Sequence, residues 1–215
     1  PWIGLDAWWN AEFSWDGANL QTSIDSGQTW QNVGLFGDPY NWYTDNSIDG
    51  QPGGSNQGWT GRDATNNGSG GYVRSVHSMA NLAGEPAVLL RVAFGSDGSV
   101  VDDGFAFDNI NIARQPVLYL GPDTTACDSV TLFGGNGSAW VWSTGDTTQS
   151  ITVDSSGNYT ATMFDQYGFP TQDVILVTIE GPRTWDLGND STYCLANSAT
   201  LAAGAGAQSY LWSDG

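Results

Sequence analysis

One short sequence occurs twice in this chain of 215 residues. Residues 120–127 read Leu-Gly-Pro-Asp-Thr-Thr-Ala-Cys, and residues 187–194 read Leu-Gly-Asn-Asp-Ser-Thr-Tyr-Cys. Each copy is followed, after a short apolar stretch, by a Trp-Ser-x-Gly signature, at 142–145 and again at 212–215. A repeat of this length marks an array of small modules rather than one closed domain. Because the second copy ends at its signature, we expect the chain to be a piece of a longer protein.

The rest of the chain has the composition of an all-β protein. Glycine occurs 29 times, and turn-forming Asn, Asp, Ser and Thr separate short runs rich in Trp, Tyr, Phe, Val and Ile. No stretch shows sustained helical periodicity. The repeat and two short Pro-containing linkers divide the chain into a first domain at 1–114, a complete module at 117–180 and an incomplete one at 183–215.

Strands of the first domain are predicted from apolar runs bounded by turn residues. The predicted strands are 3–9, 18–24, 30–34, 71–79, 87–94 and 104–113. The dipeptides Asn67-Gly68 and Asp97-Gly98 predict tight turns. Residues 36–70 form a long loop-rich tract, and a tract of this length inside a compact domain is often functional. For 117–180 we expect about seven short strands.

The charge balance excludes several classes of partner. The chain has 23 acidic residues against five arginines and no lysine, a formal net charge of −18. Nucleic acids and anionic membrane surfaces need clustered basic side chains, so we expect neither as a partner. No apolar run approaches the roughly 18 residues of a membrane span, so no membrane insertion is expected. Asp side chains in turns suit divalent cations, although surface Asp also serves solubility alone.

Residues suited to catalysis are scarce. His77 is the only histidine, it lies in an alternating strand-like run, and no Gly-x-Ser-x-Gly elbow accompanies it. We therefore expect His77 to be structural and the chain not to be an enzyme. Cys127 and Cys194 occupy equivalent positions of two modules, so they are not expected to pair with each other. Phe169 stands where a partner for Cys127 would fall.

Residues 23–30 match the Asp-box pattern Ser-x-Asp-x-Gly-x-Thr-Trp in full. In this pattern Asp and hydroxyl side chains bond the backbone of a hairpin turn, and Gly supplies a positive φ. We interpret this single copy as a folding device rather than a sugar site. Trp30, like Trp15 and Trp142, is expected in a core. Trp42, Tyr43 and Trp59 of the loop tract could form a stacking platform for a sugar, or serve packing instead.

Residues 104–110, Gly-Phe-Ala-Phe-Asp-Asn-Ile, resemble the Gly-x-Ala-x-Asp-Asp-Ile closing strand of MAM-type jelly rolls. Segment 1–113 as a whole resembles a jelly-roll module of secreted Bacteroidetes proteins, without its opening strand. The resemblance implies a structural cation beside the matching residue, Asp108, and we expect Ca²⁺. Further oxygen ligands are expected from the acidic neighbours Asp97, Asp102, Asp103, Glu12 and Asp16.

The two repeats resemble the PKD-like, immunoglobulin-type modules of the same secreted proteins. Besides the repeated phrase, Ser156-Gly157-Asn158-Tyr159 and Asp173-Val174 match that pattern. The resemblance implies immunoglobulin-like β-sandwiches after the jelly roll, export by type IX secretion and an extracellular or cell-surface location. Short Asp-Ser/Thr patterns match the O-glycosylation pattern of that group, with acceptors at Thr124, Ser129, Thr147 and Ser191.

Three functions fit these features. The first is a non-catalytic part of a multidomain surface protein that acts in adhesion or display. The jelly roll would then be a binding head or spacer, the repeats a stalk, and a glycan or other cell-surface molecule the ligand. The second is an accessory region of a large secreted hydrolase, a protease or a glycan-degrading enzyme. The third is a subunit of an extracellular filament or sheath, which differs from the first in self-association.

Overall fold

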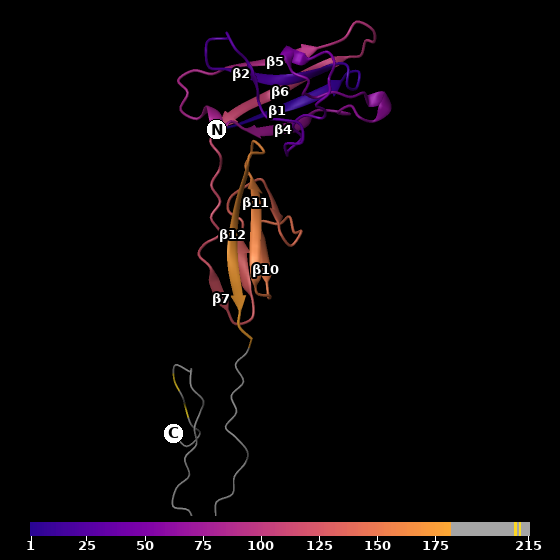
Figure 1. Ribbon diagram of the computed structural model, residues 1–215. Coiled ribbons are helices and arrows are strands. Elements are labelled where there is room, and N and C mark those ends of the chain that lie inside the picture. The colour runs from indigo at the N-terminus through magenta and orange to yellow at the C-terminus, as the bar shows by residue number, and fades with distance from the viewer. Residues whose placement is uncertain (182–208, 210, 212–215) are drawn as a thin grey trace, which may run out of the picture.

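The computed structural model describes residues 1–181, 209 and 211, and within them the chain is built almost wholly of β-strands. Twelve strands fall into two groups, one above the other in Figure 1. Three short 3₁₀ turns, Pro52–Gly54, Asp63–Thr65 and Ala80–Leu82, interrupt the loops. The prediction of an all-β chain made of sandwiches is confirmed. The predicted module at 183–215 lies outside the described residues.

The first sandwich consists of two antiparallel sheets. One has the order β4-β1-β6 and the other the order β3-β2-β5. The predicted strands of this segment are confirmed, with shifts of at most two residues at their ends and none for 104–113. The strands are β1 (Trp2–Asn10), β2 (Gly17–Ser23), β3 (Gln31–Asn32), β4 (Val73–Ser78), β5 (Leu89–Gly95) and β6 (Gly104–Ala113).

Strand β1 shows how the sequence builds this core. Ile3, Leu5, Ala7 and Trp9 occupy every second position, and alternate side chains of a strand point to opposite faces of the sheet. Ile3, Leu5, Ala7 and Trp9 are therefore buried between the two sheets, together with Leu20 of β2. The outer face of the same strand carries Trp2, Gly4 and Asp6. Trp2 on this outer face packs against Phe169 of the second sandwich.

The predicted turn at Asp97-Gly98 does not join two paired strands. Asp97-Gly98 lies in the connection from β5 to β6, but these strands belong to different sheets and do not pair. The connection at 96–103 therefore crosses from one sheet to the other instead of closing a hairpin. A two-residue turn joins only adjacent antiparallel strands, so the dipeptide alone could not show which strands it connects.

The second sandwich has one sheet of order β10-β8 and one of order β7-β12-β11-β9. Its core centres on Trp142 of the repeat signature, which is 2% exposed. The signature forms a tight turn in which Gly145 has a φ of 91° and its N–H donates to the Trp142 carbonyl, at 2.9 Å. The six strands are β7 (Thr124–Ala126), β8 (Val130–Phe133), β9 (Ala139–Trp142), β10 (Ser150–Val153), β11 (Gly157–Phe164) and β12 (Pro170–Ile179).

The two sandwiches meet through the loop at 165–169, between β11 and β12. Asp165 Oδ1 accepts hydrogen bonds from the N–H groups of Tyr167 (2.8 Å) and Phe169 (2.9 Å), so the loop is held by its own side chain. Phe169 is fully buried, with its ring centroid 6.4 Å from that of Trp2. The Arg74 Nε–H of β4 donates to the Tyr167 carbonyl at 2.9 Å. The junction is therefore a packed interface and not only a linker.

Candidate functional site

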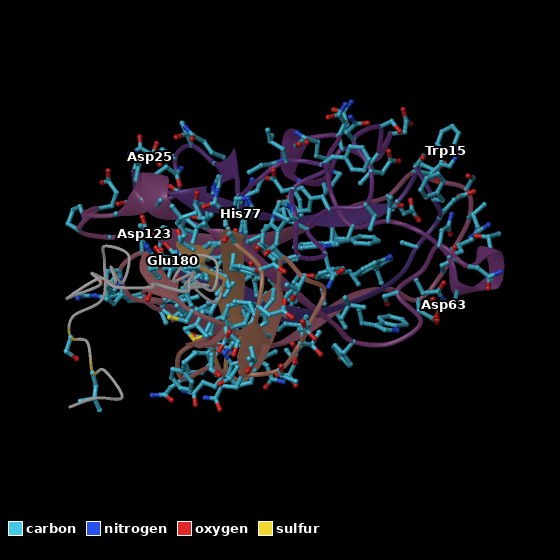
Figure 2. The ribbon with its side chains drawn as sticks, turned by 90° about the horizontal axis from the view of Figure 1, so that it is seen from below. Trp15, Asp25, Asp63, His77, Asp123 and Glu180 are labelled. Atoms are coloured by element: carbon cyan, nitrogen blue, oxygen red, sulfur yellow. The ribbon has the colours of Figure 1, made fainter. Side chains whose placement is uncertain are left out.

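Four of the predicted cation ligands line one pocket at an end of the first sandwich. This acidic pocket, of about 310 Å³, contains Asp16 from the β1–β2 loop and Asp97, Asp102 and Asp103 from the β5–β6 connection. Trp15 is next in sequence to Asp16, and Asp63 is next to Arg62, which pairs with Asp102. Both mark this end in Figure 2, far from Asp25 of the Asp-box turn. The fold therefore places these four of the six expected ligands along one pocket.

Asp16 is the most buried acid of the pocket, with 4% of its surface exposed. Its Oδ1 accepts a hydrogen bond from the Asp97 N–H at 2.9 Å. Burial raises the pKa of Asp16, and the charges of Asp97 and Asp102 raise it further, against the lowering effect of the Asp97 N–H and of Arg62. Burial disfavours the charged form of a carboxyl group, so ionised Asp16 destabilises the folded state.

Arg62 supplies positive charge beside these acids. Its Nε lies 2.5 Å from Asp102 Oδ2, and the charges of Glu12 and Asp16 also act on it. Glu12 Oε2 is buried and has no hydrogen-bond partner among the described residues. Within residues 1–181, no three His, Cys, Asp or Glu side chains lie close enough together to hold a metal ion. In this arrangement Arg62 offsets part of the negative charge.

Asp108 lies apart from the acidic pocket. It stands on β6 opposite Asp6 of β1, five residues beyond Asp103, and a strand rises about 3.3 Å per residue. The separation along the strand is therefore roughly 16 Å. Among the described residues, Asp108 Oδ1 accepts a hydrogen bond from the N–H of Asn109 alone, at 2.7 Å. Of the six expected ligands, Asp108 and Glu12 are therefore not among the residues that line the pocket, and Asp108 lies well away from it.

The predicted stacking platform is in the core. Trp42, Tyr43 and Trp59 are 2%, 3% and 0% exposed, and their rings pack against one another with centroids 4.8–5.5 Å apart. These rings therefore cannot stack on a sugar at the surface. The loop tract that carries them runs beside β2, where Trp59 and Ala18 exchange backbone hydrogen bonds. The alternative of a packing role fits the structure.

The other expected core tryptophans differ in burial. Trp142 is buried as predicted, whereas Trp15 is 47% exposed, so its core assignment was wrong. Trp30 is half-buried beneath the Asp-box turn, and the Arg91 guanidinium lies 4.2 Å from its ring centroid. Trp15 sits in a loop after the bridge residue Ala11, where strand periodicity no longer applies.

The Asp-box has the local geometry expected from its sequence. Asp25 accepts hydrogen bonds from the Thr29 hydroxyl (2.6 Å) and N–H (2.9 Å) and from the Ser23 hydroxyl (2.7 Å). Gly27 has a φ of 88°. The Thr29 and Ser23 hydrogen bonds lower the pKa of Asp25 to about 2, because they stabilise the carboxylate form. Every one of these bonds lies within the turn, which is consistent with a folding device.

His77 is held by two local contacts. Its Nε2 lies 2.9 Å from Asp38 Oδ2 and its Nδ1 lies 2.7 Å from the Ser78 carbonyl. Its ring also packs against Trp42, with centroids 5.0 Å apart. Both ring nitrogens are thus engaged within the first sandwich. These contacts are compatible with the structural role expected for His77.

The glycosylation and cysteine predictions fall on the second sandwich. Ser129 and Thr147 are exposed, Thr124 is partly buried on β7, and Ser191 lies outside the described residues. Cys127 is exposed and carries no disulfide in the described part of the chain, which does not include Cys194. Phe169, the position expected for a partner cysteine, instead packs against the first sandwich.

No protein-family model and no curated protein sequence matches the chain. The likeness to MAM-type and PKD-like modules is therefore carried by the quoted residues alone. None of the described residues forms a helix long and apolar enough to cross a membrane.

Proposed function

We propose that this chain is a non-catalytic part of a secreted, multidomain cell-surface protein that acts in adhesion or surface display. The first sandwich, read as a MAM-like jelly roll, is the binding head. The second sandwich, read as a PKD-like module, is the first unit of a stalk. The single observation that carries this proposal is the buried junction at Phe169, which joins one end of the second sandwich to the outer face of a sheet in the first (Figure 1). A packed junction holds a head at a fixed angle, and a flexible tether does not.

Charge and surface chemistry support the same role. The net charge of −18 keeps an extracellular protein soluble and opposes self-association. The exposed Ser129 and Thr147 leave room for glycans on the stalk unit.

An adhesion assay tests this function. Fluorescent beads coated with the full chain are expected to be retained on at least one of three insoluble surfaces, mucin, cellulose or chitin, above beads coated with albumin. The same preparation is expected to release no product from casein or from these glycans. Product release with no bead retention would instead favour the hydrolase region. Growth of light scattering with time in the bead-free protein would favour the filament subunit.

We also propose that Ca²⁺ binds at the acidic pocket and fixes the β5–β6 connection. The donors fit a hard cation, since all are carboxylates and Glu12 Oε2 is buried without a partner. Binding requires Asp97, Asp102 and Asp103 to close toward Asp16 as Ca²⁺ replaces Arg62. The connection is lightly packed, with Val101 92% exposed, so it has room to move.

Asp16→Asn is expected to separate two effects of this carboxyl group, the destabilisation caused by its buried charge and its contribution to Ca²⁺ binding. In EDTA the variant should melt at a higher temperature than the wild type. The amide oxygen of Asn still accepts the hydrogen bond from the Asp97 N–H. The variant also lacks the buried charge of Asp16, which destabilises the folded state above the ordinary pKa of Asp and no longer does so in acid, where the carboxyl group is protonated. Ca²⁺ at about a hundredfold excess over Kd should stabilise the wild type by about 2.7 kcal/mol and the variant far less.

The matched control is Asp108→Asn, which should keep the full response to Ca²⁺ because Asp108 lies apart from the pocket. Calorimetry in EDTA and in CaCl₂ measures both effects. A wild-type melting temperature that is the same in the two solutions would remove the calcium site and leave the adhesive function standing.

A further inference from the structure

We propose that the cleft between the two sandwiches binds a neutral saccharide. This inference rests on the adhesive function proposed above and names its ligand class. The cleft, about 340 Å³ in volume, lies where the 165–169 loop meets the outer face of the β4-β1-β6 sheet. Its size is at the lower end of the range for small-molecule sites, which often form between domains. We call it the junction cleft; its polar walls come from Asp6, Arg74, Asn109, Asn111, Gln166 and Tyr167.

Arg74 holds the walls of the junction cleft together. Its Nη1 donates to Asp6 Oδ1 at 3.2 Å and to the Asn109 carbonyl at 2.9 Å, while its Nε donates to the Tyr167 carbonyl at 2.9 Å. These contacts join β1, β4 and β6 of the first sandwich to the loop of the second. The cleft therefore exists in this form only when the sandwiches are docked.

A bulge in β6 directs an amide into the same place. Gly4 pairs with Asn111 and Asp6 with Asp108, so β6 carries one extra residue between these pairs. Asn109, within the bulge, has a φ of 49°, which is unfavourable for a residue other than glycine. Its Nδ2 donates to Asp6 Oδ2 at 2.7 Å. Bulges of this kind re-aim side chains and are common beside binding sites.

The charges of the junction cleft argue against an ionic ligand. Asp6 and Arg74 are opposite in sign and paired, and both oxygens of Asp6 already accept hydrogen bonds. A cation would have to displace these donors. An anion would meet an arginine whose Nε and Nη1 are already bonded and whose Nη2, without a hydrogen-bond partner among the described residues, is buried out of its reach. It would also meet a chain whose net charge is −18. A neutral ligand avoids both costs.

The polar groups of the junction cleft that make no hydrogen bond within the described residues suit the hydroxyl groups and the ring of a sugar. No hydrogen bond within the described residues engages the Gln166 amide or the side-chain oxygens of Asn109 and Asn111. These oxygens accept from hydroxyl groups, and the Gln166 amide both donates and accepts. Tyr167 is 37% exposed, so its ring offers an apolar face for the C–H groups of a sugar. Polar amides beside one partly exposed ring match a polyhydroxylated ring compound.

The test is a titration of the full, ¹⁵N-labelled chain with neutral tetrasaccharides made of glucose, xylose or N-acetylglucosamine. At least one is expected to shift the side-chain amide signals of Asn109, Asn111 and Gln166. A galacturonate oligomer and CaCl₂ are the charged comparisons, and neither should shift these three signals.

Gln166→Ala removes one ligand contact without disturbing the fold, because this side chain makes no hydrogen bond within residues 1–181. Its affinity for the active saccharide should fall about fivefold to tenfold, the effect of one lost hydrogen bond. Gln149→Ala, an exposed glutamine on the same sandwich, is the matched control and should bind like the wild type.

The proposal is overturned if no neutral saccharide shifts the three amides, if only a charged probe does, or if Gln166→Ala binds as tightly as the wild type. Retention of the coated beads by a surface in any of these cases would leave the adhesive function intact and place its site elsewhere. Absence of retention on every surface would instead count against the function itself.

Discussion

Phe169→Ala is expected to uncouple the two sandwiches while leaving each one folded. The Phe169 ring is fully buried between them, against Trp2 and Tyr167. Truncation of a buried Phe typically costs about 3–5 kcal/mol. Here much of that loss falls on the interface, because the ring lies outside the core of the second sandwich. Calorimetry should show two transitions moving apart, and small-angle scattering should show a wider range of dimensions.

Two further variants sharpen this experiment. Gly4→Ala disturbs the contact with Phe169 from the side of the first sandwich, since a Cβ at this position would overlap Arg74 Nη2 and lie 3.0 Å from the Phe169 ring. It should weaken the junction as well. Phe133→Ala, on β8 and 50% exposed, is the matched control and should change little. If Phe169→Ala melts and scatters like the wild type, the junction is not a rigid connection.

The strands were predictable because their signal is local. In β1 and β11 the alternation of side chains follows from the two-residue period of a strand, which the sequence carries directly. The Asp-box was predictable for the same reason, since all its hydrogen bonds join residues within one turn. The grouping of Asp97, Asp102 and Asp103 also follows from their closeness in sequence, and only Asp16 had to come from elsewhere.

The residues that the sequence analysis missed depend on contacts between distant segments. Arg74 meets Asp6 and Tyr167, which lie 68 and 93 positions away, so no pattern around Arg74 could show its partners. Phe169 was compared with the position of a missing cysteine, because a repeat shows which positions of two modules are equivalent. A repeat does not show which residues of neighbouring domains contact each other. The positive φ of Asn109 has one weak signal in the sequence, the residue type itself, since Asn tolerates that conformation better than most residues.

The tract at 36–70 is a second case in which the sequence pattern did not show where a segment packs. Gly and Asn separate its aromatic residues, which is typical of an exposed loop, yet Trp42 and Trp59 complete the core. The two sheets have three strands each, and the aromatic rings of the loop belong to the same core cluster as the buried residues of β1 and β2. Composition predicts that a segment is irregular and cannot predict which surface the segment covers.

Trp59→Ala therefore tests whether this loop tract belongs to the core. Trp59 is fully buried, its Nε1 donates to the Asn41 carbonyl at 3.1 Å, and its ring centroid lies 4.8 Å from that of Tyr43. The variant should lose about 3–5 kcal/mol of the free energy of unfolding. Small domains have about 5–15 kcal/mol in total, so the first sandwich should be largely unfolded in mild urea, where the wild type is native.

Trp15→Ala provides the comparison that separates burial from ligand binding. Trp15 is 47% exposed, so its removal should leave the urea midpoint within experimental error of the wild type. Urea titrations followed by near-ultraviolet circular dichroism measure both variants. A Trp59→Ala protein that stays as stable as the wild type and loses only saccharide binding would restore Trp59 to a ligand site. Because Trp59 touches Trp42, Tyr43 and Phe105 at once, we expect the opposite: the loss of stability comes first, and any loss of binding follows from it.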